Sequence, residues 1–299
     1  MPELPDVNVY VEAIRERVGG HKLLRTIVKS PFLLRSTTPP ISATAGRTVM
    51  ELRRVGKQIA IGVEGDLWLV LHLMIAGRLH WKTSAPKLGS RNILVAFEFD
   101  NGWLWLTEAG TQRRAALRVV DGQAGLQSLS AGGIEPLDVS IDAFAAALRS
   151  TNHTLKRSLT DPHIFSGIGN AYSDEILHRA QLSPIAMTQK LTDDEVGRLY
   201  DATRMTLIEW TDRLRAESNG EFPEKVTAFR PEMAVHGRYG QPCPRCGAKV
   251  QRIRYASNET NYCATCQTGG RLLADRALSR LLHQDWPRTL EELEAIKKR

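Results

Sequence analysis

Four cysteines lie close together in this 299-residue chain, and the chain has no others. They form two pairs, Cys243 with Cys246 and Cys263 with Cys266, and sixteen residues separate the pairs. Two residues lie inside each pair, and this spacing lets both thiolates of a pair bind one ion. The intervening segment is long enough for a β-hairpin that returns the second pair to the first. We therefore expect one structural Zn2+ ion bound by four thiolates, with no open position for chemistry.

The alternative interpretation of the cysteines is a set of redox dithiols, which would need a thioredoxin-like βαβ pattern that the sequence lacks. A reducing compartment also favours metal over disulfides. The start of the chain has no basic segment followed by an apolar one, and no run of ~18 apolar residues occurs. We expect a bacterial cytoplasmic or nucleoid protein with no membrane span and no nucleotide cofactor.

The cysteine segment is also the most basic part of the chain. The whole chain has 40 Lys and Arg against 33 Asp and Glu, with pI ≈ 9.4, whereas residues 235–280 hold eight basic and two acidic residues. Arg252 and Arg254 lie between the two cysteine pairs. Excess positive charge indicates an acidic partner, most often nucleic acid. Charge alone leaves a merely soluble basic protein as the alternative, and a lone zinc ribbon can also bind protein.

A second candidate site is the Gly-Ile-Gly-Asn sequence at 167–170, which precedes the helical pattern AYSDEILHRA. Glycines let a backbone approach a ligand closely. Asn170 is placed at the expected N-cap, where unpaired N–H groups favour an anion such as phosphate. The plain alternative is a helix start with an ordinary cap.

Two kinds of structure must position these groups. Residues 1–130 indicate a helix at about 5–18 and then mostly strands, including a hairpin with its turn at Asp100-Asn101-Gly102. After Gly-Gly and Pro at 129–138 the period becomes helical, with Asp142 as the expected cap of the first helix. We expect an α+β multidomain protein with a β-rich domain at 1–130, a helical domain at 141–234, a zinc finger at 235–270 and a helical tail at 271–299.

Taken in order, these pieces resemble a known family. Pro-Glu-Leu-Pro at 2–5, a β-rich first half, Gly-Ile-Gly-Asn and the finger HGRYGQPCPRCG…YCATCQ are similar to formamidopyrimidine-DNA glycosylases and endonuclease VIII over residues 2–268. Glu3 favours the formamidopyrimidine branch, because the other branch has glycine in the third place. The resemblance implies an N-terminal β-sandwich, a helix–two-turn–helix domain and the finger, with damaged DNA bound between the halves by a monomer. It also implies excision of oxidised or ring-opened bases followed by strand cleavage.

The resemblance gives the N-terminus a chemical role. Removal of Met1 would expose Pro2 as a secondary amine, and an α-amino pKa of ~8 leaves roughly a tenth of it neutral at pH 7. The family implies that Pro2 attacks C1′ of the damaged nucleotide and that the resulting iminium permits β- and δ-elimination. Glu3 would protonate the sugar oxygen, and Lys57 would contact a phosphate near the lesion.

Other positions match residues of the family that contact DNA. Asn170 matches the phosphate-binding asparagine of the helical domain, and Lys156 matches a basic position of the same domain that is a candidate for DNA binding. Ile75 and Arg113 match residues that fill the space left by an extruded base. Arg252 and Arg254 are candidates for backbone contacts in the finger.

The chain departs from the family pattern where DNA is gripped. Asn258 stands where the finger usually has arginine, Ala115 where phenylalanine is expected, and Ile75 where methionine is expected. We expect a divergent member with an altered lesion preference. The alternative is a non-catalytic or lesion-restricted damaged-DNA-binding member. A zinc-ribbon regulator of transcription would not explain the N-terminus.

Overall fold

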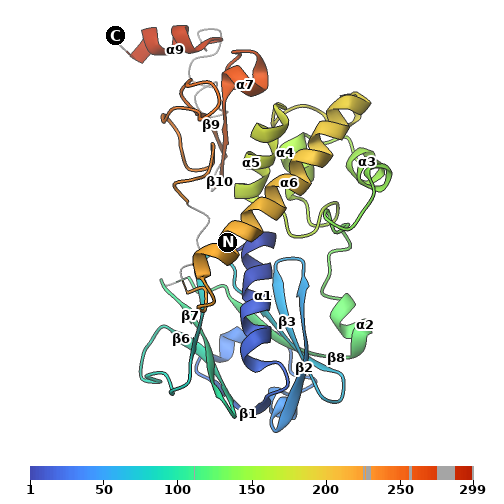
Figure 1. The fold of residues 1–299 in the computed structure, drawn as a ribbon, viewed down its shortest axis with the longest axis vertical. Coiled ribbons are helices and arrows are strands. Elements are labelled where there is room, and N and C mark those ends of the chain that lie inside the picture. The colour runs from blue at the N-terminus through green and yellow to red at the C-terminus, as the bar shows by residue number, and fades with distance from the viewer. Residues whose placement is uncertain (111, 225, 227–229, 256–257, 275–286, 298–299) are drawn as a thin grey trace. The chain divides into compact units, whose positions relative to one another are not determined.

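The computed structural model describes residues 1–299 except 111, 225, 227–229, 256–257, 275–286 and 298–299. The chain folds as two compact units (Figure 1). The first contains Met1–Ala131 and Glu209–Ala228, and the second contains Gly132–Ile208 and Phe229–Arg299. Within the described part of the chain, no helix has both the length and the apolar character needed to cross a membrane.

The described residues of the first unit form helices α1 and α2, the end of α6, eight strands and short 3-10 turns. The predicted early helix is present as α1 (Leu4–Val18). The strands are β1 (Lys22–Val28), β2 (Arg47–Val55), β3 (Gln58–Val63), β4 (Leu67–His72), β5 (Gly77–Lys82), β6 (Ile93–Phe99), β7 (Gly102–Glu108) and β8 (Ala116–Asp121). Helix α2 (Gly122–Gln127) and 3-10 turns at Pro31–Leu33 and Ile41–Thr44 complete it.

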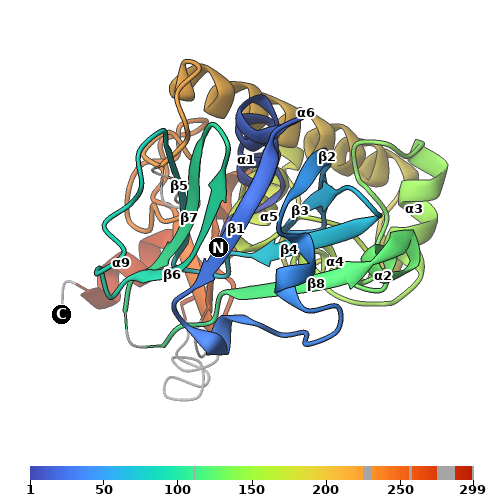
Figure 2. The same cartoon turned by 90° about the horizontal axis from the view of Figure 1, so that it is seen from below.

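The strands form one sheet that folds over on itself. Their order is β5-β7-β6-β1-β2-β3-β4-β8, and β1 pairs with β2 at two positions, which divides the sheet into two four-stranded halves (Figure 2). Both halves bury alternate side chains in one hydrophobic core that α1 also joins. The expected β-sandwich is therefore confirmed, as is the hairpin β6–β7, in which Phe99 pairs with Gly102.

The second unit begins with the predicted helices. They are α3 (Ile141–Arg149), α4 (Leu155–Thr160), α5 (Asn170–Ala180) and α6 (Asp193–Ser218), with a 3-10 turn at Thr188–Lys190. Helix α6 starts in the second unit and ends in the first.

Two predicted helix caps are wrong by one or two residues. Asp142 does not cap α3, because the extended Ser140 precedes the helix and its hydroxyl accepts the N–H of Ala143 at 3.3 Å. Asp142 already lies in the first turn. The N-cap of α5 is Gly169, and Asn170 is the first helical residue. Before each of these two helices, more than one residue close to the helix start can act as the N-cap. Only the backbone conformation shows which residue does so.

The cysteine segment contains the predicted hairpin, formed by β9 (Gln251–Tyr255) and β10 (Asn258–Tyr262). Helix α7 (Ala264–Thr268) follows it. The predicted tail helix is present as α9 (Leu290–Lys297), while 275–286 lie outside the described residues.

Candidate active site, metal centre and DNA contacts

The start of the chain lies against the first turn of α1. Pro2 is buried and Glu3 is 3% exposed. Glu3 and Asp6 form a capping box, in which the Asp6 carboxylate accepts the N–H of Glu3 at 2.9 Å. Two acids at a helix N-terminus are also favoured by the helix dipole. The Pro-Glu-Leu-Pro-Asp sequence thus folds locally so that a buried carboxylate lies next to the α-amino end.

The charges of four ionisable side chains act on the α-amino group of Met1. Burial is the main cause that lowers the pKa of this amine below 8.0. Glu3 and Asp6 oppose the change by favouring the ammonium form, whereas Arg78 and Lys57 lower the pKa further. The tertiary structure therefore brings Glu3 and Lys57 to the same amine, together with Arg78.

Lys57 belongs to the tight turn that joins β2 and β3. Val55 pairs with Gln58 across this turn, and Gly56 takes the left-handed conformation, with φ 61°, that such turns need. The Arg54 guanidinium donates to Asn8 Oδ1 of α1 and to the carbonyl of Gly56, each at 2.9 Å. Arg54 thereby ties the turn that carries Lys57 to the helix that carries Glu3.

Arg78 is the site residue that sequence reasoning missed. It lies in β5, directly after the turn that carries Ile75, and its Nη1 donates to the carbonyls of Ile75 and Gly77 at 3.2 and 2.7 Å. Ile75 is 62% exposed, and Met74 before it has a positive φ of 53°. The only sequence signal for Arg78 is its place next to Ile75, which says nothing about the distant N-terminus.

Arg113 lies on the segment between β7 and β8. Glu108, 1% exposed, holds this segment because its carboxylate accepts the N–H of Arg114 at 3.0 and 3.1 Å and that of Ala115 at 3.0 Å. The exposed Arg113 donates to the carbonyl of Arg91 at 2.6 Å. Ala115 is 4% exposed and belongs to the core of the first unit, so this position offers little surface to a ligand.

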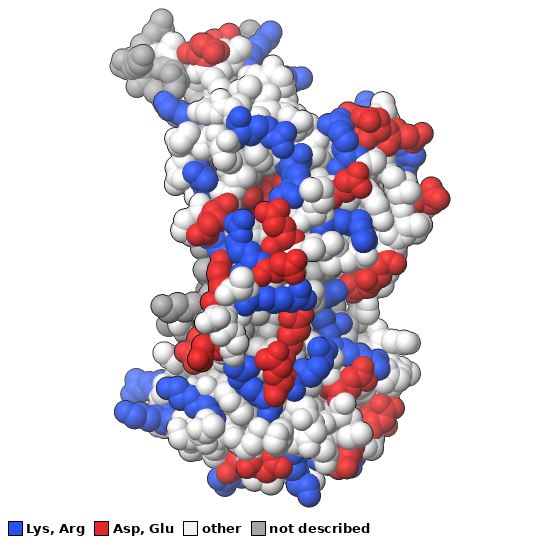
Figure 3. Space-filling view, in the orientation of Figure 1, with Lys and Arg blue, Asp and Glu red and all other residues white. Residues whose placement is uncertain are grey.

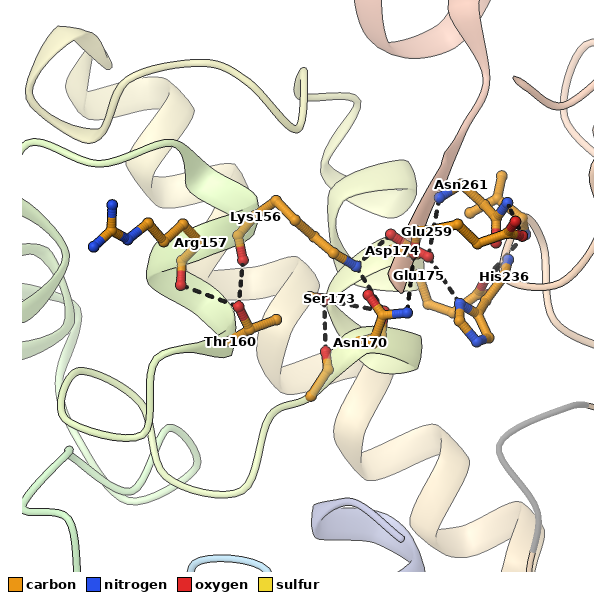
Figure 4. Close-up of polar contacts among 12 residues, drawn as sticks. Lys156, Arg157, Thr160, Asn170, Ser173, Asp174, Glu175, His236, Glu259 and Asn261 are labelled. Atoms are coloured by element: carbon orange, nitrogen blue, oxygen red, sulfur yellow. Dashed lines mark hydrogen bonds and ion pairs between the residues drawn. The ribbon is translucent and has the colours of Figure 1, made fainter. Parts of the chain in front are cut away.

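In the second unit, Lys156 and Asn170 meet at the start of α5 (Figure 4). Lys156 Nζ donates to the Asn170 carbonyl at 2.7 Å and pairs with Asp174 Oδ1 at 2.5 Å. Asp174 is fully buried, and its other oxygen binds His236 Nδ1 at 2.8 Å and accepts the N–H of Asn261 at 3.1 Å. Lys156 is thus already paired with a buried carboxylate.

Glu175 and Asn170 connect α5 to the finger. The Glu175 carboxylate accepts the backbone N–H groups of residues 234, 235 and 236 at 2.7, 2.9 and 2.9 Å. Burial raises the pKa of Glu175, and these three bonds oppose the rise. Asn170 Nδ2 donates to the Glu259 carbonyl of β10 at 3.0 Å. The candidate phosphate-binding asparagine is therefore held by the finger hairpin (Figure 4).

The two finger arginines lie on β9. The Arg252 guanidinium lies 4.0 Å from the ring centre of Tyr239 and 3.4 Å from the Glu259 carboxylate. Arg254 is exposed. The side chain of Asn258 lies outside the described residues. Its expected effect on DNA binding therefore stays a prediction.

The surface of the first unit around α1 and the end of α6 is a poor candidate for DNA. Figure 3 shows acidic and basic side chains mixed on the face that it displays, and in the first unit Arg215 pairs with Glu12 and with Asp212, each at 2.6 Å. A mixed surface gives no sustained attraction for phosphates.

The four cysteines converge on one point. Their Sγ atoms all lie within 4.8 Å of one another, with 3.4 Å between Cys246 and Cys263 and 3.9 Å between Cys243 and Cys266. Tetrahedral zinc thiolate bonds of ~2.3 Å imply sulfur separations of about 3.8 Å. His178 Nε2 lies 3.2 Å from Cys243 Sγ, where it can orient that ligand. The donor set fits a metal ion.

Comparison with known proteins agrees with this architecture. The model of the formamidopyrimidine-DNA glycosylase N-terminal domain matches residues 1–117, that of the formamidopyrimidine-DNA glycosylase H2TH domain matches 133–213, and that of the zinc finger found in FPG and IleRS matches 240–269. Formamidopyrimidine-DNA glycosylase of Heliobacterium modesticaldum is 33% identical over 280 residues, which cover 89% of this chain and 100% of that protein. The chain belongs to the formamidopyrimidine-DNA glycosylase family.

Solved structures give the same result. The crystal structure of the MutM (Fpg) protein of Thermus thermophilus matches with a TM-score of 0.72 and 29% identity, over 89% of this chain and 98% of that one. The wild-type Lactococcus lactis Fpg in complex with DNA containing an oxidised pyrimidine matches with a TM-score of 0.79 and 24% identity, over 89% and 100% of the two chains. The second likeness supports the fold alone.

Proposed function

We propose that this protein is a bifunctional DNA glycosylase and abasic-site lyase that removes oxidised or ring-opened bases. Its nucleophile is Pro2, exposed by removal of Met1. The observation that carries the proposal is the surroundings of the N-terminus: Pro2 is buried next to Glu3, and the charges of Glu3, Lys57 and Arg78 act on the α-amino group of Met1, whose pKa burial lowers. Membership of the family supports the glycosylase class.

The reaction begins when the neutral nitrogen of Pro2 attacks C1′ of the damaged nucleotide. The bond from C1′ to the base breaks, and the base leaves with the electron pair and takes up a proton. The nitrogen of Pro2, now bonded to C1′, loses its own proton and regains its lone pair. Glu3 donates a proton to the ring oxygen as the C1′–O4′ bond breaks, and the nitrogen lone pair then forms the iminium. A secondary amine gives an iminium that stays charged.

The iminium then acts as an electron sink for strand cleavage. Loss of the C2′ proton to a general base sends electrons toward the iminium nitrogen, and the C3′–O bond breaks with release of the phosphate. Loss of the C4′ proton and cleavage of the C5′–O bond follow in the second elimination. Water finally hydrolyses the iminium and frees Pro2.

The remaining residues have supporting roles in the proposal. Lys57 binds a phosphate next to the lesion, and its charge, like that of Arg78, favours the neutral amine. Ile75 and Arg113 enter the space that the extruded base leaves. DNA phosphates are also contacted by residues of the second unit, namely Lys156, Asn170, Arg252 and Arg254.

Cys243, Cys246, Cys263 and Cys266 hold one Zn2+ ion in this proposal. The ion fixes the fold of the finger, and four thiolates leave it no position for substrate. We retain the division into a catalytic domain at 1–130, a DNA-binding helical domain at 141–234, a finger at 235–270 and a tail. The protein acts as a monomer on damaged DNA without a nucleotide cofactor. A chromosomal substrate implies the bacterial cytoplasm or nucleoid as its place of action.

A second candidate is a lesion-restricted or non-catalytic binder of damaged DNA. The buried Ala115 favours it, because this position cannot supply a wedge between bases. A lesion that is already poorly stacked would need no wedge. Comparing excision from single-stranded and duplex substrates tests the restriction, and equal preference for ordinary duplex 8-oxoguanine would contradict it.

The decisive experiment is covalent trapping. The purified protein is incubated with a labelled oligonucleotide holding one abasic site, and borohydride is added to reduce the iminium. We expect an adduct with the wild-type protein and none with Pro2→Gly or with protein that retains Met1, as checked by mass spectrometry. If the wild-type protein lacks Met1, binds the oligonucleotide and gives no adduct, the non-catalytic candidate replaces the proposal.

A further inference from the structure

The C-terminal tail is a part of this chain that the proposed function leaves unused. The family model of the finger ends at residue 269, and the Heliobacterium relative is matched over its whole length by 89% of this chain. Two leucines of the segment that follows Gly270 are nevertheless buried. Leu272 and Leu273 are each 6% exposed, and Leu272 N–H donates to the Arg288 carbonyl at 2.9 Å.

The tail packs on one face of the β9–β10 hairpin. Ile253 and Tyr262 of the hairpin share a hydrophobic core with Leu272 and Leu273, and Leu290 and Leu293 of α9 pack against it. The Tyr262 hydroxyl also accepts the N–H of Leu273 at 2.8 Å. This core differs from the one at the cysteines, which contains Val235 and Val250.

The opposite face of the hairpin and its free edge carry polar groups. Side chains alternate between the two faces of a strand, so Arg252 and Asn261, which are cross-strand partners, point away from Ile253 and Thr260. The backbone N–H of Asn261 donates to Asp174, and the backbone carbonyl of Glu259 accepts from Asn170, so α5 contacts the free edge of β10. The hairpin therefore has helix α5 at one edge and the tail on one face.

An isolated two-stranded hairpin is marginally stable in water and needs an apolar partner. The contacts to α5 are polar, and the metal centre lies beyond the end of the strands. We propose that the tail is the apolar support of the finger hairpin, and that it thereby positions Asn170 and Arg252 for binding DNA. The DNA-binding part of this inference rests on the proposed function.

The test compares two changes on α9. The double variant Leu290→Asp, Leu293→Asp places charge where α9 meets the hairpin. Glu291→Ala is the matched control, because Glu291 is exposed on the same helix. A milder variant, Tyr262→Phe, removes the hydroxyl that binds Leu273 and keeps the ring in the core. All are studied as the full metal-loaded chain.

Two readouts are taken. Hydrogen exchange of peptides covering β9 and β10 reports the hairpin without DNA, and titration with an abasic-site duplex reports affinity. We expect the double variant to exchange about tenfold faster and to bind about tenfold more weakly, equivalent to ~1.4 kcal/mol. Tyr262→Phe should shift both readouts in the same direction by less, and Glu291→Ala should match wild type.

Each outcome decides something. Unchanged hairpin exchange in both the double variant and Tyr262→Phe overturns the support role. Faster exchange with unchanged affinity overturns the positioning of the DNA contacts. Failure of the proposed function would appear separately, as absence of a borohydride adduct with the wild-type protein, and would leave the exchange result to decide the role of the tail.

Discussion

The N-terminal site and the α5–finger junction both contain two adjacent or nearly adjacent buried acids, but the acids have different surroundings. Asp6 accepts a bond from Glu3, three positions away. Glu175 and Asp174 instead bind residues 234–236 and Asn261, which are 59 to 87 positions away. The junction uses its carboxylates to join distant segments, whereas the N-terminal site keeps its carboxylates beside a buried amine.

The two lysines predicted to contact phosphate show the same contrast. Lys156 pairs with the fully buried Asp174 and its side chain is 13% exposed. Lys57 lies on a tight turn, and its charge lowers the pKa of the α-amino group. Similar residue types therefore pair with a buried carboxylate in one region and, in the proposed function, support chemistry in the other, and substitutions can separate the two roles.

The largest effect is expected for Glu3→Gln compared with Glu175→Gln. Glu3→Gln removes the proposed proton donor, and excision should fall by ~100-fold to 10,000-fold while the thermal midpoint stays near wild type. Glu175→Gln should lower the thermal midpoint, because an amide can accept fewer of the three backbone bonds. Single-turnover excision and calorimetry make the comparison. Equal loss of stability in both variants would remove the distinction between the regions.

The next effect concerns the two lysines. Lys156→Ala leaves the buried Asp174 carboxylate without its cation and should cost ~3–5 kcal/mol of unfolding free energy. Lys57 is only partly buried, so Lys57→Ala should cost less stability than Lys156→Ala, about 1 kcal/mol or less, and weaken DNA binding. Denaturant unfolding and DNA titration of both variants provide the measurement. If the Lys156→Ala variant proved as stable as wild type, the ion pair between Lys156 and Asp174 would contribute nothing to the stability of the protein.

A smaller effect is expected in the pH dependence of trapping. The reactive form of the Pro2 amine is the neutral one. Burial lowers the pKa of the Met1 α-amino group, and we expect the same surroundings to lower the pKa of the Pro2 amine once Met1 is removed, so adduct formation should rise with pH through a midpoint below that of an exposed α-amine. Arg78 lowers the pKa of the Met1 amine, so Arg78→Gln should move the midpoint upward. The measurement is the initial rate of borohydride trapping between about pH 5 and 9. A midpoint at or above that of an unperturbed amine contradicts the role of burial.

The smallest effect is expected for Ile75→Ala. Ile75 is 62% exposed, so its loss should leave stability nearly unchanged. Excision from duplex DNA should fall by roughly tenfold, because a space-filling side chain is lost, and excision from single strands should not change. Matched duplex and single-stranded substrates provide the comparison. Equal losses on both substrates would assign Ile75 another role.

Much of the fold could be predicted because its signals are local. Apolar, β-rich runs indicate strands, the Asp100-Asn101-Gly102 turn indicates a hairpin, and the Cys-x2-Cys pairs indicate a metal site. The predicted caps Asp142 and Asn170 were wrong, and the observed caps are Ser140 and Gly169. Several neighbouring residues can cap a helix, and the backbone conformation selects one of them. The contribution of Arg78 and the pairing of Lys156 with Asp174 had no local signal at all.

By itself, the sequence determined the element types, the clustering of four thiols, and an N-terminus that begins Met-Pro-Glu. The tertiary structure decided which charges surround the α-amino group, which lysine is paired with a buried acid, and that Leu290 and Leu293 of the tail pack against the finger core. The physical reason is the separation along the chain over which each interaction acts. Propensity, capping and ligand spacing act over a few residues, whereas burial and ion pairing depend on segments that meet only when the whole chain has packed.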